Sequence, residues 1–162
     1  MELASNFYRE LSSNDGPPNL FVGIESAIRN LSAKYMLYII SSSSTGNIKR
    51  VLNHYGLGKY FVDVCGQDKM KDIHKSDPKF VLIPMGKWEL RKDSTISIGD
   101  TVDEITAGHK AGLRTIACSW GWQDRKLLQE AKPGFLVDSP EQLNKAATTL
   151  FSKQQRVEER LK

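Results

Sequence analysis

The sequence has few of the residues that crosslink small secreted proteins or bind structural zinc. Its 162 residues include two cysteines, Cys65 and Cys118, and three histidines. No CxxC pair occurs, and no histidine–cysteine cluster has the spacing of zinc ligands, so the sequence argues against a structural zinc site. Each cysteine ends an apolar run, and we expect both to be buried, reduced thiols of a cytoplasmic protein.

Long hydrophobic segments and clusters of basic residues are also missing. No uninterrupted apolar segment approaches the length of a bilayer span, and the first residues lack the apolar core of a signal peptide. The net charge is +4, and the basic residues are scattered among acids. Nucleic-acid binding would need a clustered basic stripe or a known motif. We therefore expect neither a membrane nor a nucleic acid as a partner.

Apolar periodicity alternates between strand and helix along the chain, whose length suits one domain. Short apolar runs predict strands at residues 35–40, 61–65, 95–98, 114–118 and 135–137. Helical spacing is found at residues 24–31, 48–55, 80–85, 105–111 and 127–131, and after residue 140. This alternation predicts an α/β fold in which helices cover both faces of a parallel sheet.

The two ends of the chain differ in composition from its middle. Residues 1–20 hold a short amphipathic segment and a run of turn-forming residues, whereas residues 152–162 are charged. We expect the core domain over residues 21–151, followed by a charged tail that frays. Ahead of the last helix, Ser139 matches an N-cap and Pro140 a first helical turn.

Acidic residues follow the strand predicted at residues 95–98. Gly99 and Asp100 end the run, and Asp103 and Glu104 come directly after it. Ligands of open α/β sheets bind at the carboxyl ends of the strands, and carboxylate oxygens suit Mg²⁺. Asp103 and Glu104 also have a plainer interpretation, because acids stabilise the first turn of a helix through its dipole. The position of Asp100 on the strand end itself favours a functional role.

Two other segments suggest a phosphate site. Ser41 and Ser42 follow the first strand, where a hydroxyl and the free amides of the next helix could bind an anion. Alternatively, these serines are only N-cap and turn residues. Lys75 precedes a helix start at Pro78 and could hold a phosphate or neutralise the acids, but it could also be an ordinary surface lysine.

Taken in order, these segments resemble the motifs of the haloacid dehalogenase superfamily of phosphohydrolases. The likeness is greatest to its phosphoglycolate phosphatase and β-phosphoglucomutase-like branch, and it covers about residues 21–143. Ser41 and the helix after it resemble the second motif, Lys75 and Pro78 the third, with Ser76 in place of a proline, and residues 99–112 the fourth. Trp120-Gly121 resembles the loop that follows the next strand. The resemblance implies a Rossmann-like, three-layer parallel sheet.

The resemblance also implies roles for individual residues. Ser41 and Ser42 would bind phosphate, and Lys75 would bridge phosphate and nucleophile. Asp100 would be a ligand of a Mg²⁺ cofactor, with Glu104 standing where a second aspartate is usual. The substrate would be a phosphorylated small molecule or phosphate ion.

One motif of the superfamily is missing from this sequence. Its members carry a strand ending in Asp-x-Asp-x-Thr, which supplies the nucleophile and the general acid/base, and no Asp-x-Asp occurs here. We therefore expect a core without the nucleophile strand, with the cap largely absent and only a remnant of it at residues 1–20. The strands ending at Ser41 and Asp100 must then pair directly, or self-association or a partner chain must complete the sheet.

Three hypotheses for function remain open. The first is a degenerate domain that is inactive or very weak alone but still binds phosphate or Mg²⁺. The second is an active Mg²⁺-dependent phosphomonoester phosphatase whose nucleophile comes from a partner or a longer parent chain. The third is a non-catalytic interaction module that reuses the fold.

Overall fold

All strands lie parallel to the strands that they pair with. The structure is a computed structural model that describes residues 19–70 and 72–160. The strands are β1 (Leu37–Ser41), β2 (Phe61–Gly66), β3 (Ile96–Gly99), β4 (Arg114–Cys118) and β5 (Phe135–Val137). Each lies within a residue or two of a strand that the apolar runs predict. The predicted parallel α/β architecture is therefore confirmed.

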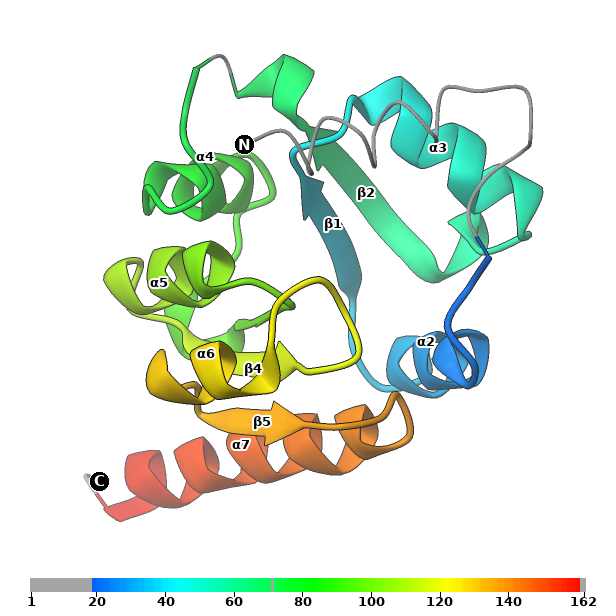
Figure 1. The fold of residues 1–162 in the computed structure, drawn as a ribbon. Coiled ribbons are helices and arrows are strands. Elements are labelled where there is room, and N and C mark those ends of the chain that lie inside the picture. The colour runs from blue at the N-terminus through cyan, green and yellow to red at the C-terminus, as the bar shows by residue number, and fades with distance from the viewer. Residues whose placement is uncertain (1–18, 71, 161–162) are drawn as a thin grey trace.

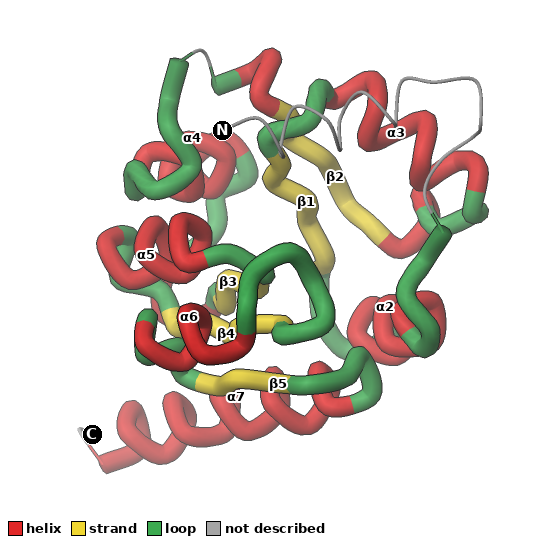
Figure 2. Tube along the Cα trace, viewed as in Figure 1, coloured by secondary structure: helices red, strands yellow, loops and turns green. Residues whose placement is uncertain are grey.

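Helices cover both faces of the strands (Figure 1, Figure 2). They are α2 (Ile24–Ser32), α3 (Thr45–His54), α4 (Lys79–Lys87), α5 (Val102–Lys110), α6 (Arg125–Glu130) and α7 (Gln142–Arg160), with short 3₁₀ helices at Gly58–Tyr60, Gln67–Lys69 and Lys92–Ser94. None of these helices has both the length and the apolar composition needed to span a bilayer, as far as the described residues go.

Successive side chains of a strand pack against helices on opposite faces of the sheet. Ile39 of β1 and Val64 of β2 pack with α3 in one cluster, whereas Ile40 and Cys65 pack against Phe80 of α4 in another. This alternation follows from the two-residue period of a strand. Because both faces are covered, the strands read as continuous apolar runs.

The strands form two separate sheets. β1 pairs with β2, and β3, β4 and β5 form a second sheet in that order of pairing, β3 to β4 and β4 to β5. β1 and β3 do not pair with each other, and no strand of the described chain lies between them. Of the two arrangements expected for the strands that end near Ser41 and Asp100, direct pairing is therefore wrong. Helices hold the two sheets together, since α2 contacts α7 and α4 contacts α5.

The last helix begins later than the sequence pattern predicts. Ser139 and Pro140 form a turn in which the amide of Gln142 donates to the carbonyl of Ser139 at 3.1 Å, and α7 begins at Gln142. The helix then continues through Arg160, beyond the residue at which the charged tail was expected to begin. The amphipathic segment predicted within residues 1–18 lies outside the described residues.

Candidate functional site

The acids after β3 lie at the amino end of α5. Thr101 is the N-cap of this helix and accepts a hydrogen bond from the amide of Glu104 at 3.3 Å. In return, Glu104 Oε2 accepts from the amides of Asp100 at 3.0 Å and Thr101 at 3.2 Å. Thr101 and Glu104 thus form a capping box, which satisfies amides that would otherwise lack partners. Glu104 therefore has a structural role whatever else it binds.

The loop after β4 surrounds Asp100. The amide of Trp122 donates to Asp100 Oδ2 at 2.7 Å, and the amide of Gln123 donates to the Asp100 carbonyl at 3.3 Å. A Cβ atom at Gly121 would lie 2.2 Å from Asp100 Oδ2, which is too close for any side chain. The small residue at position 121 thus allows the loop to hold the Asp100 carboxylate through Oδ2.

Lys75 brings a positive charge to these acids. Its Nζ donates to Thr101 Oγ1 at 3.4 Å, at the start of α5. Burial and the neighbouring charge of Asp100 raise the pKa of Glu104, and the charge of Lys75 acts in the opposite direction. The fold therefore gathers Lys75, Asp100 and Glu104 into one cluster, in which negative charge is costly and a cation would relieve the cost.

The donor atoms of this cluster fit Mg²⁺. Asp100 and Glu104 supply carboxylate oxygens, and Mg²⁺ commonly takes one or two protein carboxylates while water and substrate phosphates fill its other positions. No group of three or more His, Cys, Asp or Glu side chains that could hold a metal occurs in the described part of the chain. Two carboxylates are as many as Mg²⁺ commonly takes from a protein.

The serines after β1 act first as turn and cap residues. Ser41 Oγ accepts a hydrogen bond from the amide of Ser43 at 3.1 Å, and Ser44 caps α3 by accepting from the amide of Asn47 at 3.2 Å. A Cβ atom at Gly66 would lie 2.2 Å from the amide nitrogen of Thr45, so the end of β2 packs directly on this loop. The N-cap of α3 is thus Ser44, whereas Ser41 takes part in the turn before it.

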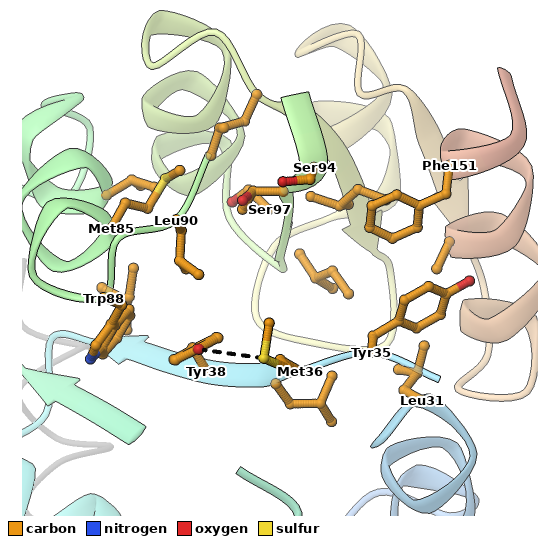
Figure 3. A pocket seen from close by; sticks show the side chains of 18 of the residues that line it. Leu31, Tyr35, Met36, Tyr38, Met85, Trp88, Leu90, Ser94, Ser97 and Phe151 are labelled. Carbon is orange, nitrogen blue, oxygen red and sulfur yellow. Dashed lines mark hydrogen bonds between the residues drawn. The ribbon is translucent and has the colours of Figure 1, made fainter. Parts of the chain in front are cut away.

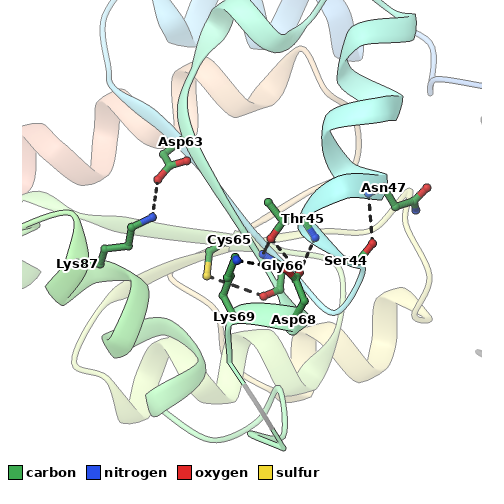
Figure 4. A network of polar contacts seen from close by, with 9 residues as sticks. All are labelled: Ser44, Thr45, Asn47, Asp63, Cys65, Gly66, Asp68, Lys69 and Lys87. Atoms are coloured by element: carbon green, nitrogen blue, oxygen red, sulfur yellow. Dashed lines mark hydrogen bonds and ion pairs between the residues drawn. The ribbon is translucent and has the colours of Figure 1, made fainter.

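An acid that the sequence analysis did not single out lies at the amino end of α3. Asp68 Oδ1 accepts from the amide of Thr45 at 2.6 Å and from its hydroxyl at 2.8 Å (Figure 4). These hydrogen bonds lower the pKa of Asp68. A carboxylate therefore already satisfies one of the amides that a bound anion would use. Nothing in the local pattern around Asp68 indicated this long-range contact.

The predicted site residues fall into two groups. Lys75, Asp100 and Glu104 form one cluster, as described above. Ser41 ends β1 in the other sheet, and within residues 19–70 and 72–160 it makes no hydrogen bond or ion pair with that cluster. Ser42 lies in the same turn as Ser41. The two groups lie at the ends of strands that do not pair.

Cys65 and Cys118, which both lie among the described residues, are buried free thiols, as expected. Cys118 ends β4 near the acidic cluster, and burial, with smaller effects from the charges of Asp100 and Glu104, raises its pKa to about 12. A thiol with such a pKa is almost fully protonated at neutral pH, and it is inert as a nucleophile. Cys118 is therefore a buried packing residue at the end of β4.

Known proteins match most of this chain. A family model described as haloacid dehalogenase-like hydrolase matches residues 3–118. A phosphoglycolate phosphatase from Synechococcus elongatus is 30% identical over 133 residues, which are 82% of this chain and 61% of that protein. One from Vibrio parahaemolyticus is 24% identical over 143 residues, which are 88% and 61% of the two chains. This chain therefore spans about 61% of the length of these curated relatives.

Solved structures have the same fold. A predicted phosphatase from Clostridium acetobutylicum gives a TM-score of 0.76 at 23% identity, covering 88% of this chain and 67% of that one. A haloacid dehalogenase-like hydrolase from Streptococcus pneumoniae gives 0.74 at 20% identity, with the same shares covered, 88% and 67%. The matched residues 3–118 include Ser41, Lys75 and Asp100, and they make up most of the chain. The expected resemblance is thus confirmed, and the chain belongs to the haloacid dehalogenase-like hydrolase family.

Proposed function

We propose that this chain supplies the phosphate- and Mg²⁺-binding part of a phosphomonoester hydrolase site and is inactive or very weak alone. The observation that carries the proposal is the contact of 3.4 Å between Lys75 Nζ and Thr101 Oγ1. It brings a cationic side chain from the segment before α4 to the end of β3, where Asp100 and Glu104 lie. A cation beside two carboxylates suits a site that holds both a metal ion and an anion.

Each residue of the cluster has a distinct role in this proposal. Asp100 and Glu104 would hold Mg²⁺, which when bound neutralises charge on the phosphate oxygens. Lys75 would hold another phosphate oxygen through Nζ. Ser41 and Ser42 would donate hydroxyl hydrogen bonds to the phosphate from the other sheet. All of these groups bind and orient a phosphate, but none of them attacks phosphorus.

Activity would require a nucleophile from outside this sequence. The chain contains no Asp-x-Asp pair, and removal of a covalent nucleophile costs many orders of magnitude in rate. We therefore expect binding without appreciable turnover. The substrate class is a small phosphate monoester, and 2-phosphoglycolate is the first probe because several relatives are named phosphoglycolate phosphatases.

Binding is tested by thermal unfolding with and without Mg²⁺ and inorganic phosphate. Ligands that bind only the folded chain raise its melting temperature. We expect Asp100→Asn to abolish the Mg²⁺-dependent rise, whereas Asp103→Asn, a matched change three residues along the chain, leaves it intact. Lys75→Ala should remove the added effect of phosphate. Equal responses of the Asp100 and Asp103 variants would contradict the proposed site.

Turnover separates the three hypotheses. Hydrolysis of p-nitrophenyl phosphate and 2-phosphoglycolate is measured with Mg²⁺ present, and we expect none above background. Robust turnover that Asp100→Asn abolishes would overturn the proposed inactivity and favour a complete phosphatase. If the chain shows neither turnover nor a Mg²⁺ or phosphate response, the interaction-module hypothesis is favoured instead.

A further inference from the structure

A cavity of about 500 Å³ separates the two groups of candidate site residues. β1 runs along one side of it and β3 along the other (Figure 3). Ser41 ends β1, whereas Asp100 follows β3, and these two strands do not pair with each other. Hydrogen bonds within a sheet therefore do not set the distance between the turn after Ser41 and the acids. Contacts that run around the cavity have to set it.

The residues just before α4 contact the acidic side of the site. Residues 72–78 form the Lys75 segment, which leads into α4 at Lys79. From this segment, Lys75 Nζ donates to Thr101 Oγ1 at 3.4 Å, at the start of α5. The position of Lys75 beside the acids therefore depends on what holds the Lys75 segment in place.

Gln67, directly after β2, joins the Lys75 segment to the turn after β1. Its backbone amide donates to the carbonyl of Ser43 at 2.9 Å, in the turn that follows Ser41. Its side-chain Nε2 donates to the carbonyl of Ile73 at 3.2 Å, two residues before Lys75. One residue therefore contacts the serine turn through its backbone and the Lys75 segment through its carboxamide.

The backbone beside this hydrogen bond has an uncommon conformation. Asp72 has a φ of 49°, in the left-handed region that few residues other than glycine adopt. Such a conformation persists where neighbouring contacts enforce it. The carboxamide of Gln67 binds the next carbonyl, that of Ile73, and the Ile73 side chain packs against the buried residues Met70 and Phe80. One polar and one apolar contact thus fix the start of the Lys75 segment.

Local hydrogen bonds hold the rest of the Lys75 segment. The amide of Asp77 donates to the carbonyl of His74 at 2.9 Å, and Asp77 Oδ1 accepts from the amide of Lys79 at 2.8 Å. Lys75 lies inside this turn, between the carbonyl that Gln67 binds and the start of α4. A displacement of that carbonyl would therefore move Lys75.

We propose that Gln67 is a positioning residue that holds Lys75 beside the acids of the site. It acts through the carbonyl of Ile73, and its own amide ties this carbonyl to the turn after Ser41. Gln67 itself contacts neither phosphate nor metal. The position of Lys75 against Thr101 is a property of the fold. Only the consequence that Gln67 raises the affinity for phosphate rests on the proposed function.

The first test uses the full chain without ligand and follows the backbone amide signals of Thr101 and Val102 by NMR. Gln67→Met removes the Nε2 donor but keeps the length and the neutral charge of the side chain. We expect it to shift these signals in the same direction as Lys75→Ala does, because both changes weaken the contact of Lys75 with Thr101. Unchanged signals in Gln67→Met, beside shifted signals in Lys75→Ala, would overturn the proposal.

A matched control and a second variant complete this test. Gln129→Met on α6 loses the hydrogen bond that Arg125 donates to Gln129, and it should leave the Thr101 signal unchanged. Equal shifts in the Gln67 and Gln129 variants would contradict a specific role for Gln67. If Gln67→Met does not fold, Gln67→Glu takes its place, because an ionised carboxylate has a similar shape but cannot donate to a carbonyl.

The second test measures the dissociation constant of inorganic phosphate by calorimetry with Mg²⁺ present. We expect Gln67→Met to weaken phosphate binding about three- to tenfold, the range of one hydrogen bond, and Lys75→Ala to weaken it about tenfold or more. In a chain that already carries Lys75→Ala, Gln67→Met should change the constant less than about twofold, because it acts only through the lysine. An equal effect of Gln67→Met with and without Lys75 would overturn the proposal.

The two tests separate failure of this proposal from failure of the proposed function. If the original chain binds no phosphate but Gln67→Met shifts the Thr101 signal, the proposed function fails and the positioning of Lys75 stands. If the original chain binds phosphate and Gln67→Met binds it equally well, the phosphate site stands and the role of Gln67 is overturned.

Discussion

Glu104 Oε2 accepts a hydrogen bond from the backbone amide of Asp100 at 3.0 Å, so one acid of the candidate site supports the backbone of the other. The two interpretations of the acidic segment, helix capping and metal binding, thus both concern Glu104. Glu104 caps α5, and its charge adds to that of Asp100 where a metal ion would bind. The two roles can be separated, because capping needs only an oxygen acceptor whereas metal binding needs a carboxylate.

Substitutions at Glu104 should separate its helix-capping role from the effect of its charge. In Glu104→Gln the amide oxygen can still accept from the α5 amides, whereas Glu104→Ala loses the cap, at a cost of about 1–2 kcal/mol in unfolding free energy. Because the pKa of Glu104 is raised in the fold, its ionised form is disfavoured there, and stability falls as pH rises through that pKa. Urea unfolding at pH 7 should therefore show the Gln variant at least as stable as the original chain. A loss as large as that of Ala would contradict this.

Gly121 should prove essential to the position of Asp100. In Gly121→Ala, the new methyl group would overlap Asp100, so the loop or the carboxylate must move and the hydrogen bond from Trp122 is strained. We expect a loss of about 1–3 kcal/mol in stability and a smaller Mg²⁺-dependent rise in melting temperature. Gly86→Ala is the control, since a Cβ there meets nothing within 4 Å and the residue is helical. An equal response to Mg²⁺ in both variants would contradict the role of Gly121 in positioning the Asp100 carboxylate.

Cys118 should resist alkylation in the folded chain. With a pKa of about 12, on the order of one thiol in ten thousand is ionised at pH 8, and the thiolate is the reactive form. Iodoacetamide labelling at pH 8, followed by mass spectrometry of the Cys118 peptide, should therefore proceed slowly until urea unfolds the chain. Rapid labelling of Cys118 under native conditions would show that the end of β4 opens to solvent.

Local sequence patterns predict most of the fold because the spacing of apolar residues reflects which side chains are buried. The run at residues 35–40 and the acids Asp103 and Glu104 in the first turn of a helix depend on neighbours in sequence, and both features are found close to their expected places. The start of α7 differs because Ser139 and Pro140 satisfy a turn instead, which propensity alone does not distinguish from a helix cap.

The site is less predictable because backbone atoms from distant loops build it. The amide of Trp122 on Asp100 and the Asp68 carboxylate on Thr45 join residues 22 or 23 positions apart. Every residue except proline has a backbone amide, so the residue type does not reveal which amide binds a carboxylate. An isolated acid such as Asp68 resembles any surface acid. The motifs therefore locate Lys75 and Asp100 but not the groups that orient them.

Asp63, Lys87 and Trp88 form a hydrogen-bonded group, the Asp63 cluster, which should make the stability of the chain depend on pH under acidic conditions. Asp63 Oδ2 accepts from Trp88 Nε1 at 2.7 Å and from Lys87 Nζ at 2.9 Å, and these bonds lower its pKa from 3.8 to about 2. A lowered pKa contributes stability that is present above pH 3.8 and is lost as the pH falls towards 2. Since the side chain is about a third exposed, solvent screening reduces the contribution to the order of 1 kcal/mol.

Asp63→Asn tests this contribution, because an amide can still accept from the indole but carries no charge for Lys87. Urea unfolding should show the variant less stable than the original chain by about 1 kcal/mol at pH 6, with the difference disappearing near pH 2. Asp103→Asn, which removes an acid outside this cluster, should not show the same convergence. A difference between Asp63→Asn and the original chain that stays constant from pH 6 to 2 would mean that Asp63 acts through packing, because only an ionised carboxylate loses its advantage on protonation.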